Sequence, residues 1–491
     1  MKAVLVYPLF TDTFWSFKYA MKFIAKKATH PPLGLLTVAA MLPSNWELKL
    51  IDMNVMALKD KELEHADLIF ISGMSIQNES AAEVIGRCKN LGKTIVAGGP
   101  LFTSAYKEFE GVDYFVLNEA EITLPLFLED YKNDCAKNIY TTDVFPELNN
   151  TPIPRWELID MKKYASMSIQ YSRGCPYNCE FCDITNLFGR GVRTKNKEQV
   201  MAELESIYAN GWRGNVLFVD DNFIGNKKKL KKEILPAMVE WAATKKHPFL
   251  FGTEASINLS DDEELMQLMA KAGFNSVFVG IETPNEESLA ECNKLQNKNR
   301  DLVASIKRIQ KAGIEVQGGF IVGFDNDPAS IFEVMIEFIQ KSGIISAMVG
   351  LLNAPIGTRL YKRLEKEKRL LKSISGDNTD SSMNFIPVMN RDKLLNGYRK
   401  IISGIYSPKP YHARVKRYLE EYRPMKKLRL QMSDSLPLFK SIWFIGITDK
   451  ARFHYWKLFF WSLFRHPRLF GLAITYAIYG YHFRKVFKNT L

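Results

Sequence analysis

Three of the six cysteines in the 491-residue chain lie close together, in the stretch SRGCPYNCEFCDI at 172–184. They are Cys175, Cys179 and Cys182, spaced C-x3-C-x2-C. Clustered thiolates bind zinc or iron–sulfur clusters. A four-iron cluster held by only three thiolates keeps one iron open, and that iron can chelate a small molecule through an amine and a carboxylate. A zinc site would instead need a fourth ligand, and the closest downstream histidine is His247.

The cysteines follow the first of six apolar runs that alternate with helical patterns. Repeated β/α units of this spacing predict a partial (β/α)6 TIM-type barrel over residues 166–370. In such barrels the chemistry lies at the carboxyl ends of the strands, which is where the cysteines fall. The expected strands are 166–174, 215–223, 248–256, 276–283, 315–324 and 347–355.

Residues 1–135 contain an earlier α/β series, which predicts a Rossmann-like or flavodoxin-like domain. A connector is expected over 136–165, where prolines are frequent and periodicity is weak. Glycine alone explains the end of any single strand, but small residues at three successive strand ends favour a ligand that approaches the backbone closely. The candidate ligand contacts are Pro8, Ser72, Gly73, Ser75, Gly98, Gly99 and Pro100.

The cysteine spacing, with the aromatic Phe181 before the last cysteine, resembles the signature of the radical S-adenosylmethionine (SAM) enzymes. The resemblance extends over about 165–370 and implies that the open iron binds SAM and that its reductive cleavage gives a 5′-deoxyadenosyl radical, which attacks unactivated C–H bonds. A single acid at a strand end is weak support, because it is commonly a helix N-cap. The resemblance therefore rests on the order of the strand-end segments after the cysteines. It implies SAM contacts from Phe181, Asp220, Asp221, Glu254, Ser256, Glu282 and Gly323.

A Rossmann-like domain ahead of such a barrel resembles the cobalamin-dependent class of these enzymes. Segments 11–34, 98–103, 118–125 and 353–364 are similar to a subfamily that includes the hopanoid methylases. This resemblance implies cobalamin on the strand-end loops and methyl transfer to an unactivated carbon of a hydrophobic or lipid-like substrate. The alternative within the class is cyclisation, rearrangement or another C–H modification without methyl transfer.

The first domain departs from one pattern of cobalamin proteins, the motif D-x-H-x-x-G whose histidine ligates cobalt. Its two histidines, His30 and His65, both lack that context and are expected to be structural. Radical SAM members often lack the motif, so cobalamin binding is predicted to depend on the small-residue loops.

Two other classes fit the sequence less well. Methylthiotransferases that modify tRNA carry a second cysteine trio in their first domain, whereas residues 1–165 hold only Cys88 and Cys135, far apart. A net charge of +12 suits an anionic partner, but without that trio no nucleic acid is expected. A plain iron–sulfur electron carrier would need four cysteines.

Residues 371–491 are expected to form a mostly helical domain. Its segment 440–491 has nine Lys/Arg, one acid (Asp449) and fifteen aromatics, a charge surplus of +8. Two alternatives follow: a helix in a membrane interface, or a cap buried on the barrel. The start MKAVLVYPLF reads as a strand and not as a secretory leader. We therefore expect a cytoplasmic enzyme, peripheral at the inner face of the membrane if the first alternative holds, with a reductant such as flavodoxin or ferredoxin.

Overall fold

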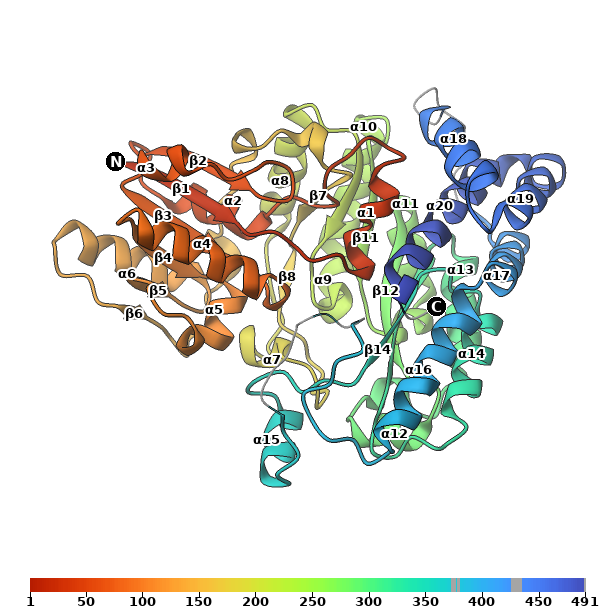
Figure 1. Ribbon diagram of the computed structural model, residues 1–491. Helices are drawn as coiled ribbons and strands as arrows, with labels where there is room; N and C mark the ends of the chain where they lie inside the picture. The colour runs from red at the N-terminus through yellow and green to blue at the C-terminus, as the bar shows by residue number, and fades with distance from the viewer. Residues whose placement is uncertain (372–376, 378–379, 425–434, 490–491) are drawn as a thin grey trace.

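The computed structural model describes residues 1–371, 377, 380–424 and 435–489. Residues 372–376, 378–379, 425–434 and 490–491, all in the region expected to be mostly helical, therefore lie outside the described residues. Figure 1 shows two sheets side by side, with the helices of the C-terminal region packed on the second. The expected α/β fold with a helical C-terminal region is confirmed.

The first sheet is parallel, in the strand order β2-β1-β3-β4-β5-β6. Successive residues of a strand face opposite sides, so Ala3 and Leu5 of β1 enter one hydrophobic core while Val4 and Val6 enter another. This alternation explains why the strand is a continuous apolar run. The strands are β1 (Lys2–Tyr7), β2 (Glu47–Asp52), β3 (Leu68–Ser72), β4 (Thr94–Gly98), β5 (Tyr114–Val116) and β6 (Ile139–Tyr140).

The order β2-β1-β3 is the flavodoxin-like arrangement, in which the winding reverses between β1 and β3. Ligands of such sheets bind outside the carboxyl ends of the strands at that reversal. The strand β6 adds to the far edge from within 136–165, the segment expected to be a connector. The main helices of this domain are α2 (Leu33–Met41), α3 (Asp60–Glu64), α4 (Asn78–Asn90), α5 (Pro100–Ala105) and α6 (Ala120–Lys132).

The second sheet is also parallel, in the order β14-β13-β12-β11-β10-β7. Consecutive strands are neighbours along it, and helices lie between them in the chain, as in six units of a TIM-type barrel. The strands are β7 (Ser166–Ile169), β10 (Gly214–Phe218), β11 (Phe249–Glu254), β12 (Phe274–Glu282), β13 (Glu315–Val322) and β14 (Ala347–Leu351). The helices between them include α8 (Lys197–Ala209), α10 (Leu235–Thr244), α11 (Glu263–Ala272), α13 (Leu302–Lys311) and α14 (Ile331–Ser342).

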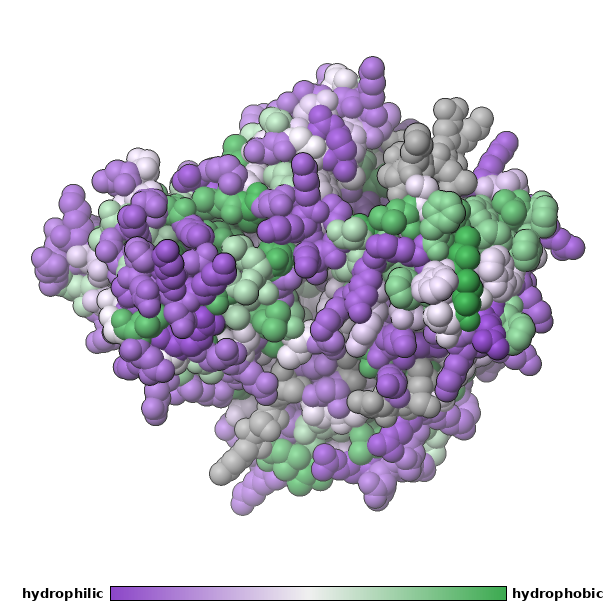
Figure 2. All heavy atoms as spheres, turned by 45° about the horizontal axis from the view of Figure 1, so that its top comes forward, coloured by the Kyte–Doolittle hydropathy of each residue, from purple (hydrophilic) through white to green (hydrophobic). Residues whose placement is uncertain are grey.

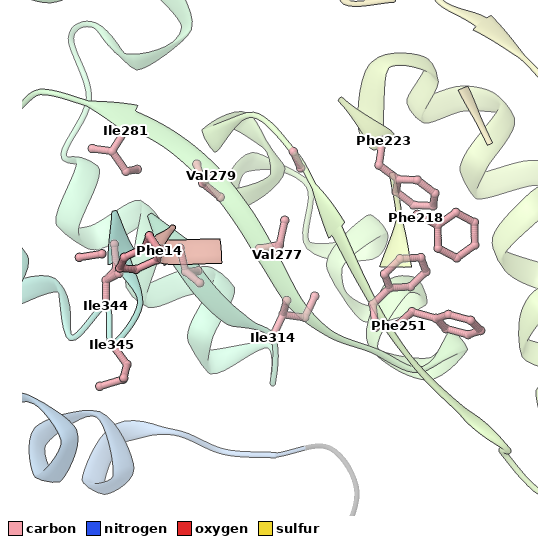
Figure 3. Packing of buried hydrophobic residues seen from close by; sticks show 14 of the residues in the cluster. Phe14, Phe218, Phe223, Phe251, Val277, Val279, Ile281, Ile314, Ile344 and Ile345 are labelled. Carbon is pink, nitrogen blue, oxygen red and sulfur yellow. The ribbon is translucent and has the colours of Figure 1, made fainter. Parts of the chain in front are cut away.

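Aromatic and branched side chains fill the core of this second sheet. Phe218 has ring centroids 5.1 Å from Phe223 and 5.5 Å from Phe251, so the three rings form one cluster at the β10–β11 side. Figure 3 shows this cluster together with the valines and isoleucines of β12 and its neighbours. Burial of such side chains is the main term that stabilises the barrel.

The C-terminal helices pack on the barrel and on one another. The hydroxyl of Tyr406 binds the backbone of Ala347 on β14 through both its N–H, at 3.1 Å, and its carbonyl, at 2.7 Å. This pairing fastens α16 to the edge of the sheet. The helices are α15 (Arg359–Lys366), α16 (Arg391–Tyr406), α17 (Pro408–Glu421), α18 (Ser435–Ser441), the π-helical turn η12 (Ile442–Ile447), α19 (Arg452–Arg465) and α20 (Phe470–Val486).

The helix α20 is a buried strut between the barrel and the first domain. Its Tyr476 donates to Glu315 of β13 at 2.9 Å, and His482 Nε2 lies 2.9 Å from the carbonyl oxygen of Phe14. The ring of Phe483 stacks on Phe14 with centroids 4.3 Å apart. Different helices of the basic aromatic tail therefore fit the two alternatives. The helix α20 is buried, as expected of a cap, whereas α19 keeps exposed aromatic side chains.

The carboxyl of Glu315 gives a test of this strut. Burial raises its pKa from 4.5 to about 7, so between these values the unfolded chain loses a proton that the folded chain keeps. The folded state is then destabilised as pH rises through that window. In the wild type the free energy of unfolding should fall by about 1–3 kcal/mol across this window. We expect Glu315→Gln, which cannot titrate, to lack this fall. Urea unfolding at pH 5 and pH 8 measures it, and parallel pH profiles for wild type and variant would contradict the assignment.

Candidate functional site

A cavity of about 690 Å³ lies between the carboxyl ends of the first sheet and the barrel. Most of its wall is apolar, and three parts of the chain build it. The first domain contributes the ends of β3 and β4 and the helix α2, the long loop after β1 contributes Phe14 and Trp15, and the barrel contributes Val219, Asp221 and Met348. The site thus forms at the predicted strand ends and joins both domains.

Five of the seven small-residue positions expected to contact a ligand line this cavity: Ser72, Gly73, Gly98, Gly99 and Pro100. Pro8 and Ser75 do not belong to the lining. Pro8 is buried, and its carbonyl oxygen accepts from Gln77 at 2.6 Å and Asn54 at 3.1 Å. Ser75 begins a short 3-10 turn and is exposed.

Two of the lining glycines are also required by the sheet itself. A Cβ on Gly98 would stand 2.6 Å from the carbonyl oxygen of Val116, and Gly99 has a φ of 86°. Gly34 in α2 differs, because it lines the cavity and a Cβ there would meet nothing within 4 Å. The space above Gly34 is therefore not filled by other protein atoms.

His30 also lies in the cavity wall, although the sequence indicated only a structural role. It is half-buried, and its Nδ1 lies 3.4 Å from Ser168 Oγ. Burial lowers its pKa to about 4, so the imidazole is neutral at physiological pH.

The three cysteines lie on one loop after β7 and the short strand β8 (Ser172–Arg173). Cys179 is buried, Cys175 and Cys182 are half-buried, and burial raises the pKa of all three thiols. Among the described residues, no three His, Cys, Asp or Glu side chains converge as a single metal ion requires.

The acids Asp220 and Asp221, after β10, hold the start of this loop. Asp220 is fully buried and accepts from the backbone N–H of Tyr171 at 3.1 Å, and from both the N–H and the hydroxyl of Ser172. Asp221 accepts from Gly174 N–H at 3.1 Å and lines the cavity. Burial raises the pKa of Asp220 to about 7 and that of Asp221 to about 6. Asp220 therefore holds the loop from the protein interior, whereas Asp221 also faces the cavity.

The loop after β11 reaches the cysteine loop through a polar chain. Ser256 Oγ lies 2.6 Å from Asn258 Oδ1, and Asn258 Nδ2 donates to the hydroxyl of Tyr177 at 2.8 Å. Glu254, the last residue of β11, keeps solvent-accessible surface. Removal from bulk water and the neighbouring charges of Asp221 and Asp220 raise its pKa to about 8. These groups lie on the side where SAM contacts are expected.

Lys294 is a half-buried cation beside the cysteines that sequence reasoning missed. Its ammonium group pairs with Glu282 at 2.7 Å. Burial lowers its pKa, but the charges of Glu282 and the Cys179 thiolate outweigh burial and raise it. Lys294 therefore stays charged near the thiols. It follows the short helix α12 (Glu286–Glu291), and no motif marks it in the sequence.

The two remaining predicted SAM contacts are Phe181 and Gly323. Phe181 and Phe324 have ring centroids 6.4 Å apart. Gly323 precedes Phe324 with a φ of 107°, and its N–H donates to Asp327 at 2.7 Å. This conformation favours glycine and turns the backbone past the end of β13.

Arg173, two residues before Cys175, forms a buried ion cluster with the first domain. Its guanidinium lies 2.6 Å from Glu119 and 2.8 Å from Glu121, at the start of α6. Arg193 lies 2.7 Å from Glu119. Burial raises the pKa of Glu121, but Arg173 outweighs it and holds the pKa below the ordinary value. The cluster joins the cysteine loop to the first sheet at the cavity wall.

A second ion cluster fastens the other end of the cysteine loop. Arg363 of α15 pairs with Glu180 at 2.9 Å and with Asp325 at 2.9 Å. The nearby Arg359 donates to the carbonyl of Asn178 at 3.2 Å. Both domains flanking the barrel thus contribute charges that position the loop.

Three family models match the chain. Residues 24–128 match the B12 binding domain, 169–339 match the radical SAM superfamily, and 358–491 match a domain of unknown function, DUF4070. An uncharacterized methyltransferase of Synechocystis sp. is 40% identical over 98% of this chain and 91% of its own length. The hopanoid C-2 methylase of Rhodopseudomonas palustris is 32% identical over 93% of this chain and 88% of its own length.

The fold also matches a solved structure. The radical SAM methyltransferase TsrM of Kitasatospora setae, determined with cobalamin and a [4Fe-4S] cluster bound, superposes with a TM-score of 0.62. It is 15% identical, and the match covers 97% of this chain and 99% of that one. At this identity the likeness is one of fold.

The buried pairing of Arg173 predicts a large effect on stability. Arg173→Met leaves the carboxylate of Glu121 without its cation and leaves Glu119 with Arg193 alone, and breaking a buried pair costs about 3–5 kcal/mol. The matched control is Lys341→Met, which breaks an exposed pair with Glu337 and should cost at most about 1 kcal/mol. Free energies of unfolding in urea measure both, and equal losses would contradict the role of the buried cluster.

Proposed function

The chain belongs to the cobalamin-dependent radical SAM methyltransferases, and from this premise we propose that it methylates an unactivated carbon of a hydrophobic, lipid-like substrate. The observation that carries the proposal is the cavity that joins the two domains. Its wall is mostly apolar, with the small-residue loops of the first sheet on one side and Asp221, beside the cysteine loop, on the other. A substrate there would meet both reactive centres.

Each cofactor of the family has a matching set of residues. Cys175, Cys179 and Cys182 would hold the [4Fe–4S] cluster, with the charge of Lys294 beside them. Cobalamin would lie against the loops after β3 and β4, in the space above Gly34. SAM would lie over the barrel strand ends, near Phe181, Asp221, Glu254, Ser256, Glu282 and Gly323. When bound, these groups supply a methyl carrier and a carbon-centred radical that removes hydrogen from an unactivated position.

The residues of the chain itself bind, orient and exclude water. Asp220 and Asp221 fix the start of the cysteine loop, and Arg363 fixes its end. Trp15 closes the cavity from the first domain: its Nε1 donates to Met348 Sδ at 2.9 Å, and its ring meets Phe278 of β12 edge-on at 5.4 Å. A closed, apolar wall keeps water from competing for a reactive radical.

Two features support a hydrophobic substrate. The lining contributed by α2 and by the loop after β1 is dominated by apolar side chains such as Phe14, Leu35 and Val38. One full-length relative carries the name hopanoid C-2 methylase. The proposal includes a small reductant protein such as flavodoxin or ferredoxin, and a cytoplasmic enzyme that works at the inner face of a membrane.

The cysteine assignment has a direct test. Alanine at Cys175, Cys179 or Cys182 should reduce dithionite-driven formation of 5′-deoxyadenosine to background, because the cluster loses a ligand. Cys135→Ala is the matched control, since this exposed cysteine lies outside the loop and should keep full activity. A triple alanine variant that still formed 5′-deoxyadenosine would overturn the assignment.

The cobalamin position is tested by filling the cavity. Gly34→Phe places a ring in open space within the cavity, so it should lower bound cobalamin at least about tenfold, equivalent to about 1.4 kcal/mol of affinity, and leave iron content unchanged. Gly86→Phe is the control, because this exposed glycine of α4 also has nothing within 4 Å of a Cβ. Absorption spectra after reconstitution report both cofactors. Equal cobalamin in the two variants would remove cobalamin from this cavity.

A further inference from the structure

The hairpin formed by α18, η12 and α19 carries a concentrated exposed apolar surface, which we name the hairpin patch. Phe453 is 69% exposed, Phe464 is 76% exposed and Phe439 is 69% exposed. Figure 2 shows hydrophobic side chains gathered at the right-hand end of the molecule, where α18 and α19 lie in Figure 1. The patch consists of Leu436, Phe439, Trp443, Phe444, Ile447, Phe453, Phe460, Leu463 and Phe464.

The exposure of the patch is built into the hairpin. One face of α19, with Tyr455 and Leu458, is buried. Along the outer face the rings of Trp456, Phe460 and Phe464 follow one another, with centroid separations of 5.5 Å and 6.2 Å. A stripe of stacked aromatics on a soluble surface marks an interaction site, because monomeric proteins rarely expose contiguous apolar patches of this kind.

Exposed cations flank the patch along the described part of the hairpin. Lys450, Arg452, Lys457, Arg465 and Arg468 are exposed on the same hairpin and its continuation. The acid of this stretch is Asp449, and its carboxylate is already paired with Arg484 at 2.9 Å. The hairpin therefore presents aromatic side chains within a field of positive charge, which complements an anionic lipid surface.

We propose that the hairpin patch docks the enzyme on the surface of an anionic lipid bilayer. Its aromatics enter the interfacial region and its lysines and arginines meet lipid phosphates. None of the described helices is long and apolar enough to cross a membrane, and an interfacial hairpin does not need to. Docking stands on the hairpin alone and does not depend on the proposed reaction.

The same hairpin contacts the segment that lines the cavity, which deepens the proposed function. Lys440 Nζ donates to the carbonyl of Lys22 at 2.7 Å, and Phe444 packs on Phe23 with ring centroids 5.7 Å apart. A few residues earlier in the chain, Phe14 and Trp15 form part of the cavity wall. A lipid-derived substrate that leaves the bilayer beside the hairpin can follow this segment to the cavity. This route rests on the proposed function.

The test compares the whole holoenzyme with a double variant, Phe453→Ser with Phe464→Ser, by flotation with vesicles. Vesicles of phosphatidylglycerol with phosphatidylcholine should carry the wild type, and pure phosphatidylcholine should carry much less. Higher salt should weaken binding without abolishing it, because screening acts only on the charges. The double variant should bind at least about tenfold more weakly, since two large apolar side chains no longer enter the interface.

The control double variant replaces two equally exposed apolar residues outside the hairpin, Val144→Ser with Leu295→Ser, at 65% and 60% exposure. It should float like the wild type. Lack of wild-type binding to anionic vesicles at low salt, or equal binding by both double variants, would overturn the proposal. A lipid-free dimer in light scattering that Phe453→Ser with Phe464→Ser disperses would also overturn it and assign the patch to a second copy of the chain.

Cofactor content and SAM cleavage in detergent solution separate this proposal from the proposed function. If the hairpin variant keeps both but no longer floats, docking is supported whatever the substrate is. If the wild type floats but neither binds cobalamin nor cleaves SAM, docking stands and the proposed reaction fails.

Discussion

The pairing of Arg173 with Glu119 and Glu121 joins the two parallel sheets at the point where the chemistry is expected. Three charged groups taken out of water are costly unless they meet with good geometry, and distances of 2.6 Å and 2.8 Å meet that condition. Arg173 stands two residues before Cys175, so the pairing also sets where the cysteine loop lies relative to the loops after β3 and β4. All three side chains line the cavity between the domains, so this contact ties its two walls together.

The C-terminal region supports the part of the cavity wall that the loop after β1 forms. Its helix α20 binds the loop after β1 through the stacking of Phe483 on Phe14 and through His482, and it binds the barrel through Glu315. Trp15 follows Phe14 directly and reaches the barrel strands. The region that matches a domain of unknown function therefore has a structural role, because it keeps an aromatic segment of the first domain against the barrel. Its outer hairpin is left free for a partner outside the chain.

The strands of both sheets and the cysteine loop were predictable because they depend on local sequence pattern. Continuous apolar runs indicated the strands of both sheets, and the cysteine spacing indicated the loop. Side-chain partners were not predictable in the same way. The sequence did not show that Asp220, an expected SAM contact, accepts hydrogen bonds from Ser172 and Tyr171. It also did not show that Pro8 and Ser75 do not line the cavity, because a strand end has several directions and sequence does not choose among them. Lys294 and Arg173 carry no motif, since long-range ion pairs leave no periodic signal. The tail was ambiguous because aromatics with cations suit both a buried helix and a membrane interface, and the tail contains both the buried helix α20 and exposed aromatic side chains on α19.

The central claim is that one chain brings a [4Fe–4S] cluster and cobalamin to the same cavity. The most direct measurement is the content of iron, sulfide and cobalamin per chain after anaerobic purification and reconstitution. We expect one cluster and one cobalamin per chain. A chain that takes up a full cluster and retains no cobalamin would contradict it, because the loops after β3 and β4 and the space above Gly34 would then serve another purpose.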